Sequence, residues 1–165
     1  MSACLQAVSF YMHGLDTVTD DWQCDIDNGR LVGAVLLDFS AAFDLIDHFL
    51  LLDTFKQYGF TGTGLNWMES YLSNRKQRGF FNGSFSDFSH VNCGVPQGSC
   101  LGPLLFLIFI NDLPLLLQKS QFSMYADDST IYVAGLNTVE IHTILDNELH
   151  LVIRWIEAKK LSTVI

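Results

Sequence analysis

The chain has 165 residues, of which 49% are hydrophobic and 16% are charged, and its formal net charge is −9. This length suits one domain with a substantial core, and the apolar excess indicates surface that packs on something outside the chain. Proteins that bind nucleic acids neutralise phosphates with Lys and Arg. The negative charge therefore argues against a complete nucleic-acid enzyme, although not against the acidic centre of one.

The cysteines and apolar runs indicate the cellular context. The four cysteines form no C-x-x-C pair, which argues against a zinc site or redox motif and predicts reduced thiols. The longest apolar run, 104–110, is too short to cross a bilayer, and the first residues lack the pattern of a secretory signal. We therefore expect an intracellular protein without a membrane partner.

The first half of the chain predicts helices around one strand. Apolar residues at helical spacing predict a helix over about 3–24, followed by a turn at 25–29. The continuous apolar run 31–37 predicts a strand buried on both faces, with Asp38 at its carboxyl end. Two further helices are predicted over about 41–58 and 64–72.

A hairpin and an apolar helix are predicted next. The dipeptide Asn82-Gly83 is a strong turn signal within the alternating segment 80–91. The basic cluster 75–78 before it is interpreted as the solvated end of the preceding helix. After a Gly-rich loop, Ser99 can cap a helix over 101–110, which we interpret as core.

The tetrapeptide 125–128, Tyr-Ala-Asp-Asp, lies at the tip of a second predicted hairpin, between strands at 121–124 and 129–134. Adjacent carboxylates repel each other, so the pair Asp127-Asp128 needs water or a cation nearby, and Mg²⁺ prefers oxygen ligands. The alternative is a solvated turn, which Asp favours for local backbone reasons. The last helix is predicted to begin after Asn137, with Glu140 completing a capping box.

Asp38 can join this pair, because a strand end and a neighbouring hairpin tip can converge. Three such carboxylates can hold two Mg²⁺ ions that clamp the attacking and leaving oxygens of a phosphoryl transfer. The alternative for Asp38 alone is that it caps the next helix.

Four motifs in order carry a resemblance to a known family. They are Leu37-Asp38-Phe39-Ser40-Ala41-Ala42-Phe43-Asp44, Gly94-Val95-Pro96-Gln97-Gly98-Ser99 continuing through Leu101–Phe106, Asn111-Asp112-Leu113-Pro114, and Tyr125-Ala126-Asp127-Asp128. Segments 71–77 and 155–162 also match sequence patterns of this family. The chain resembles reverse transcriptases over nearly its whole length, and its motif sequences are most similar to those of non-LTR (LINE-type) retrotransposons.

The resemblance implies an α+β polymerase palm, with an antiparallel sheet and helices packed on one face, as a single partial domain over residues 1–165. It implies an RNA-directed DNA polymerase that adds deoxynucleotides (dNTP) to a primer 3′-hydroxyl, with an RNA template and a DNA primer as partners. The family's fingers would precede this chain, and a lysine-containing palm segment and the thumb would follow it, unless another chain supplies them.

The resemblance also implies roles for individual residues. Asp38 and Asp127 would hold two Mg²⁺ ions, for which Mn²⁺ could substitute, and Asp128 would support the charge of the site. The side chain of Phe43 would lie beneath the incoming sugar and exclude a 2′-hydroxyl, the alternative being an ordinary core aromatic. The set of nucleotide-contacting positions would be completed by the Phe39 backbone N–H and by Gln97 and Gly98 in the loop facing the nucleotide and template.

Two other functions stay open on the sequence. The chain could be a catalytically inactive, truncated retrotransposon remnant, or a palm core reused as a protein-binding module through its exposed apolar face. An unrelated Mg²⁺ phosphatase or nuclease is disfavoured, because Asp38 lacks a second Asp two positions later and no general base is evident.

Overall fold

A computed structural model describes residues 15–39, 41–96, 98–125 and 128–163. The chain divides into two compact units. We call residues 43–109 the arm unit, and residues 15–42 with 110–163 the sheet unit.

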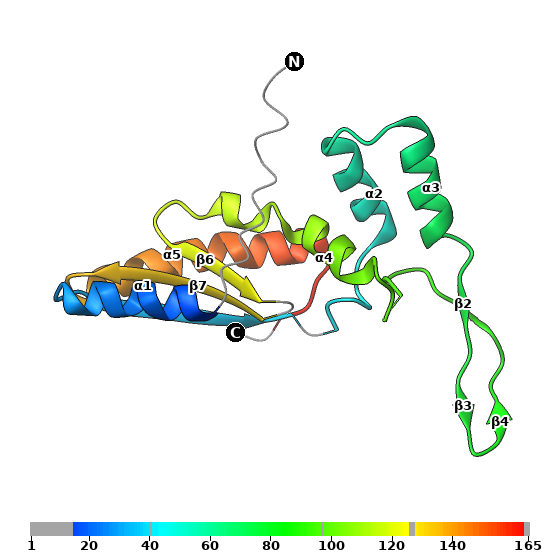
Figure 1. Ribbon diagram of the computed structural model, residues 1–165, viewed down its shortest axis with the longest axis horizontal. Coiled ribbons are helices and arrows are strands. Elements are labelled where there is room, and N and C mark those ends of the chain that lie inside the picture. The colour runs from blue at the N-terminus through cyan, green and yellow to red at the C-terminus, as the bar shows by residue number, and fades with distance from the viewer. Residues whose placement is uncertain (1–14, 40, 97, 126–127, 164–165) are drawn as a thin grey trace. The chain divides into compact units, whose positions relative to one another are not determined.

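The sheet unit contains three strands and the helices around them (Figure 1). Its elements are α1 (Leu15–Asp27), β1 (Leu31–Asp38), the 3₁₀ helix η1 (Leu113–Leu116), β6 (Gln121–Tyr125), β7 (Asp128–Gly135) and α5 (Thr138–Lys159). The arm unit contains α2 (His48–Gln57), α3 (Gly62–Leu72), β2 (Lys76–Gln77), β3 (Phe80–Phe81), β4 (Ser84–Phe85), β5 (Ser89–His90) and nearly all of α4 (Gly102–Ile110).

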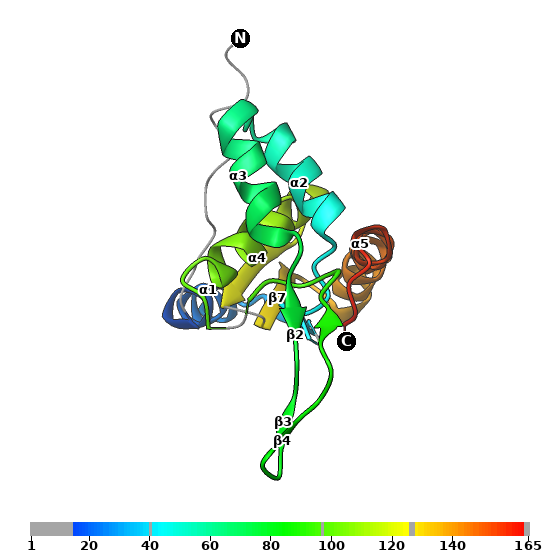
Figure 2. The same ribbon diagram turned by 90° about the vertical axis from the view of Figure 1, so that its right-hand side faces the viewer.

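The sheet is antiparallel throughout, in the order β1-β7-β6. Helix α5 covers one face, where Gly33 and Gly135 leave room for Ile141; a Cβ on either glycine would collide with that side chain. Neighbouring residues of a strand point to opposite faces, and Tyr132 on the other face makes an edge-to-face ring contact with Trp22 of α1. Figures 1 and 2 show α1 and α5 on opposite sides of the sheet. The predicted α+β class with an antiparallel sheet is confirmed, and α1 adds a helix on the second face.

Strand β1 has the predicted bounds, but the prediction that both its faces are buried is wrong. It lies at the edge of the sheet, and Leu36 is 70% exposed while Leu37 is buried. A continuous apolar run cannot reveal how much of each face is covered, because that depends on packing by segments far along the chain.

Two predicted helix boundaries need correction. Helix α1 continues to Asp27, beyond the predicted end at 24, and closes with Gly29 at φ +75°. There the N–H of Gly29 donates to Ile26 and that of Arg30 to Asp25, which satisfies the last carbonyl groups of the helix.

Helix α2 begins at His48 rather than near residue 41, because Asp47 caps it. The Asp47 carboxylate accepts hydrogen bonds from the N–H groups of Phe49 and Leu50, at 3.0 and 3.1 Å. The alternative role of Asp38 as the cap of the next helix is therefore excluded.

The caps predicted for the two later helices are confirmed. The Ser99 hydroxyl accepts a hydrogen bond from the N–H of Gly102 at the start of α4, and most of the α4 side chains are buried or half-buried. The Asn137 side chain accepts from the N–H of Glu140 at the start of α5, while the Glu140 carboxylate accepts from the N–H of Leu136 rather than from that of Asn137, so the predicted capping box forms with a shifted second bond. The apolar face of α5 packs inward, with Ile141, Val152 and Ile156 buried.

The hairpin predicted at Asn82-Gly83 is also confirmed, since β3 and β4 pair directly around these two residues. Both have positive φ, +46° and +79°, as a two-residue hairpin turn requires. The basic cluster 75–78 is not a helix end, as predicted, because α3 ends at Leu72 and Lys76 and Gln77 form β2, paired with β5. Figure 2 shows this ribbon of paired segments extending away from α3.

In the part of the chain described, no helix has both the length and the apolar character needed to cross a bilayer.

Candidate active site

Asp38 and Asp128 lie directly opposite each other on neighbouring strands. They form the last pair of the β1–β7 register, which begins at Leu31 opposite Gly135. Directly opposed residues in an antiparallel pair point to the same face, with Cβ atoms about 4.5–5.5 Å apart. Both side chains are exposed. The fold therefore brings together two carboxylates that are 90 residues apart in the sequence.

Contacts with neighbouring segments hold the backbone of both residues in place. The Thr163 hydroxyl donates a 2.8 Å hydrogen bond to the backbone carbonyl of Asp38, so the segment after α5 returns to the end of β1. On the other side, Asp128 also pairs with Tyr125, the last residue of β6. Asp127, which completes the predicted triad, lies outside the described residues.

The two carboxylates fit a divalent cation by their chemistry. They are like charges on one exposed face, and no ion pair within the described ranges involves either of them. Carboxylate oxygens are the ligands that Mg²⁺ prefers, and Mg²⁺ sites commonly use one or two carboxylates together with substrate phosphates and water. The described residues alone contain no cluster of three or more His, Cys, Asp or Glu side chains that could hold a metal.

A buried carboxylate in α5 binds the backbone of the segment that leads into β6. Glu148 is 5% exposed, and its carboxylate accepts hydrogen bonds from the backbone N–H groups of Gln118, Lys119 and Ser120, at 2.9, 2.7 and 3.1 Å. Burial by itself would raise the pKa of Glu148. The nearby Ser120 hydroxyl and the hydrogen bonds from the three backbone N–H groups outweigh that effect and lower the pKa below its usual range. The segment entering β6 is therefore held by α5.

The two phenylalanines implied by the resemblance have different surroundings. In the sheet unit, the Phe39 side chain is buried, and its backbone carbonyl accepts from the N–H of Ala42. In the arm unit, Phe43 is half-buried, and its ring centroid lies 5.3 Å from that of Phe106 in α4. The packing on Phe106 orients the Phe43 ring.

The glycine-rich loop of the arm unit has one tightly packed position. Gly94 has φ +80°, and a Cβ there would lie 2.7 Å from the Asp44 backbone oxygen. Gly98 has φ +75°, but a Cβ there would meet open space within the protein. Gln97 lies outside the described residues. Backbone conformation, rather than crowding by protein atoms, is therefore what favours glycine at 98.

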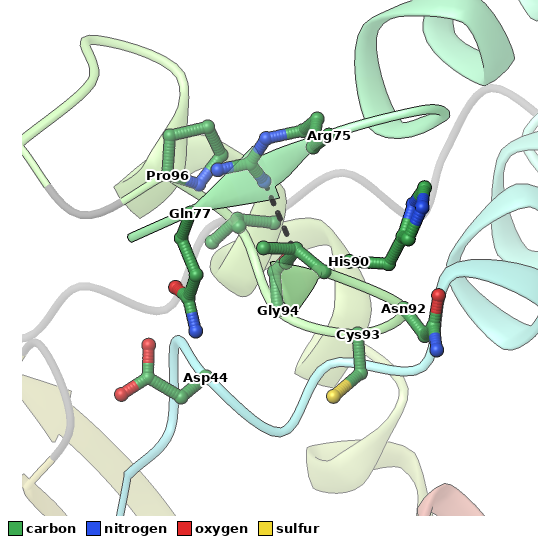
Figure 3. A pocket seen from close by; sticks show the side chains of 10 residues that line it. Asp44, Arg75, Gln77, His90, Asn92, Cys93, Gly94 and Pro96 are labelled. Atoms are coloured by element: carbon green, nitrogen blue, oxygen red, sulfur yellow. Dashed lines mark hydrogen bonds between the residues drawn. The ribbon is translucent and has the colours of Figure 1, made fainter. Parts of the chain in front are cut away.

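The arm unit also contains a polar cavity of about 570 Å³ between the base of the hairpin and this loop (Figure 3). Arg75, Gln77 and His90 line it together with Asp44 and the segment 91–96. The Arg75 guanidinium lies within hydrogen-bond reach of the Gly94 carbonyl, at 3.4 Å. These residues were missed as site candidates. The Asn82-Gly83 turn was the available signal, because pairing outward from it brings segment 75–77 beside 89–91.

Comparison with known proteins agrees with the order of motifs. Residues 4–163 match the family described as reverse transcriptase (RNA-dependent DNA polymerase). The chain is 34% identical over 106 residues to a probable RNA-directed DNA polymerase from transposon X-element of Drosophila melanogaster, covering 62% of this chain and 12% of that protein. It is 29% identical over 138 residues to the RNA-directed DNA polymerase from mobile element jockey of Drosophila funebris, covering 79% of this chain and 15% of that protein.

A solved structure supports the fold. An apo telomerase from Candida tropicalis, truncated from its C-terminal domain, matches with a TM-score of 0.60 at 12% identity, covering 84% of this chain and 32% of the telomerase chain. This similarity is consistent with the predicted polymerase palm. The family match over residues 4–163 agrees with the transposon relatives and with the order of the motifs. The chain therefore belongs to the reverse transcriptase family, as a domain of the LINE type.

Proposed function

We propose that this chain is the metal-binding palm part of an RNA-directed DNA polymerase, which extends a primer 3′-hydroxyl with deoxynucleotides on an RNA template. The pairing of Asp38 with Asp128 across β1 and β7 is the observation that carries this proposal. It puts two carboxylates from separate family motifs on one exposed face. The chain spans only 12–15% of these transposon relatives, so fingers, thumb and further parts belong to the proposal as partners in the same or another chain.

The proposed roles of the site residues follow from their chemistry. Asp38, Asp127 and Asp128 hold the divalent cations, Mg²⁺ or Mn²⁺. When bound, these cations act as Lewis acids that stabilise charge on the oxygens of a phosphoryl transfer. The opposed carboxylates of Asp38 and Asp128 put negative charge at the end of the β1–β7 pair. Glu148 holds the segment that leads into the hairpin.

The remaining residues are proposed to act on the nucleotide. The Phe43 ring excludes a 2′-hydroxyl, the Phe39 backbone N–H donates to the triphosphate, and Gln97 and Gly98 face the nucleotide and template. Replacing Phe43 by Ala tests the first of these roles in a form of the protein that extends primers. Incorporation of ribonucleotides should rise, and unchanged sugar discrimination would show that Phe43 is only a core residue.

The decisive experiment compares Asp38→Asn with a matched control, Asp20→Asn, which changes an exposed aspartate on α1. Primer extension on an RNA template should fall to background in the first variant and stay at the parent rate in the second. Binding of Mn²⁺, followed by its electron paramagnetic resonance signal, gives a readout independent of turnover, and it should weaken at least about tenfold in Asp38→Asn.

Two outcomes would contradict the proposal. Extension by Asp38→Asn at the parent rate would show that this carboxylate is not part of the site. A parent chain that is folded by circular dichroism, binds no Mn²⁺ and extends no primer would show that this chain does not carry the activity.

A further inference from the structure

The hairpin of the arm unit exposes an unusual number of aromatic side chains. We call residues 75–91 the arm. Phe81 is 86% exposed, and Phe80, Phe85 and Phe88 are between 58% and 63% exposed. Single exposed apolar residues are common on proteins, but four phenylalanines gathered on one short ribbon form a patch that points to a binding function.

Local contacts orient the aromatic rings of the arm. Phe80 and Phe85 are directly opposed in the β3–β4 pair, with ring centroids 4.6 Å apart. The Arg78 guanidinium lies 3.8 Å from the centroid of Phe85 and 4.9 Å from that of Phe88. Phe81 is next to Phe80 in β3, so it points to the other face of the ribbon. The arm therefore presents a cationic aromatic cluster on one face and a nearly free ring on the other.

The charge of the arm is opposite to that of the chain. Three of the nine basic residues, Arg75, Lys76 and Arg78, lie in it, whereas Asp87 is its only acidic residue and the chain as a whole carries −9. Protein interfaces are also enriched in arginine and aromatic residues but depleted of lysine, so within the arm it is Lys76 that argues against a protein partner. Interleaved arginine, lysine and aromatic residues instead suit a polyanion whose bases can stack.

The base of the arm continues into the cavity shown in Figure 3. Gln77, His90 and Asn92 supply side chains there that donate and accept hydrogen bonds, and Arg75 supplies a planar cation. Unpaired bases are recognised by such groups together with stacking on aromatic or guanidinium planes. A strand lying along the arm would therefore meet stacking surfaces near the turn and hydrogen-bonding groups at the base.

We propose that the arm is a binding surface for single-stranded nucleic acid, on which an unpaired base stacks against the exposed Phe81 ring while Arg78, held over Phe85 and Phe88, and Lys76 contact phosphates. The proposal rests on the proposed function, because it supplies that function with a contact surface for an unpaired strand. A duplex does not suit this surface, since its bases are already stacked on each other.

The test measures binding of a fluorescein-labelled 12-nucleotide single-stranded RNA to the full chain by fluorescence anisotropy, without Mg²⁺ or deoxynucleotides. Phe81→Ala should weaken binding about 5- to 140-fold, the range that corresponds to loss of one base–aromatic stack. Phe81→Tyr should retain it, because the ring remains. The matched control is Phe49→Ala, which removes a 74% exposed ring from α2 in the same unit.

Arg78→Ala tests the electrostatic part. It should lower the slope of log binding constant against log salt by about 0.7, as expected for one lost phosphate contact on a single strand. Arg154→Ala, which removes an exposed arginine from α5, should leave the slope unchanged. All these variants keep Asp38 and Asp128, so the arm can fail or succeed independently of primer extension.

Three results would overturn the proposal. Phe81→Ala could bind RNA as well as the parent does. A duplex of the same length could bind equally well and with the same sensitivity to Phe81. Finally, the arm variants could leave RNA binding unchanged but abolish self-association in sedimentation velocity, which would make the arm a protein interface. Circular dichroism of each variant confirms that the exposed substitutions leave the fold intact.

Discussion

Replacing Glu148 by Gln should destabilise the sheet unit and loosen the segment that leads to the proposed catalytic hairpin. In the parent, one carboxylate oxygen accepts from Gln118 and Lys119 and the other accepts from Ser120. A glutamine retains one acceptor oxygen but sets its NH₂ group against a backbone N–H. Because Glu148 is only 5% exposed, water cannot replace the lost acceptor.

The magnitude follows from these contacts. A buried donor left without an acceptor costs about 1–3 kcal/mol, and the two remaining hydrogen bonds lose the strength that a charged acceptor gives. We expect Glu148→Gln to lower the free energy of unfolding by about 2–4 kcal/mol at pH 7, measured by urea unfolding. Glu157→Gln, on the exposed side of the same helix, should change it by less than about 0.5 kcal/mol.

The effect should also depend on pH with a definite sign. The folded protein lowers the pKa of Glu148 below the ordinary value of 4.5, so the charged form is the one that stabilises the fold. The difference in free energy of unfolding between the parent and Glu148→Gln should have its full size above pH 4.5. It should shrink as the pH falls through the lower pKa of the folded protein. Hydrogen exchange of segment 118–125 should rise in the variant. A variant as stable as the Glu157→Gln control, or a difference that does not change down to pH 3, would refute the reasoning.

Two further predictions concern the backbone and a buried phenol. Gly94→Ala should lower the free energy of unfolding by about 2 kcal/mol or more in urea, because the new Cβ would lie 2.7 Å from the Asp44 backbone oxygen. Gly29→Ala should cost clearly less, because a Cβ there meets open space. Equal losses of stability in the two variants would contradict the role of this contact. Burial and the hydrogen bond to Asp21 raise the pKa of Tyr132 to about 12. Tyr132→Phe should therefore lower the free energy of unfolding by about 1 kcal/mol below pH 10, and this difference from the parent should shrink as the pH rises toward 12. A difference that grows in that range would contradict the prediction.

Much of the local structure could be predicted because short-range signals decide it. The Asn82-Gly83 turn needs two residues that tolerate positive φ, and the cap of α5 needs the Asn137 side chain beside the N–H of Glu140. Both requirements are satisfied within a few residues of sequence. The same holds for Asp38, which follows an apolar run long enough for a strand.

The errors came where a local pattern fits two arrangements. The apolar run 31–37 suits a strand buried on both faces as well as one with an exposed face, and only the packing of distant segments shows that Leu36 is exposed while Leu37 is buried. The segment 75–78 was assigned to a helix end, because its pairing partner lies beyond the turn at 82–83. The helix predicted from about 41 starts at His48 instead, because the Asp47 side chain caps it there.

The sequence by itself determined the family, the order of the elements and the identity of the acidic residues, because motifs, turn residues and caps act over short distances. Only the tertiary structure decided that Asp38 lies opposite Asp128, that Glu148 anchors the segment entering β6, and that arginine and phenylalanine side chains gather on the arm. Each of these depends on strand register or on packing between distant segments. Those are settled by which apolar faces bury each other when the chain closes on itself.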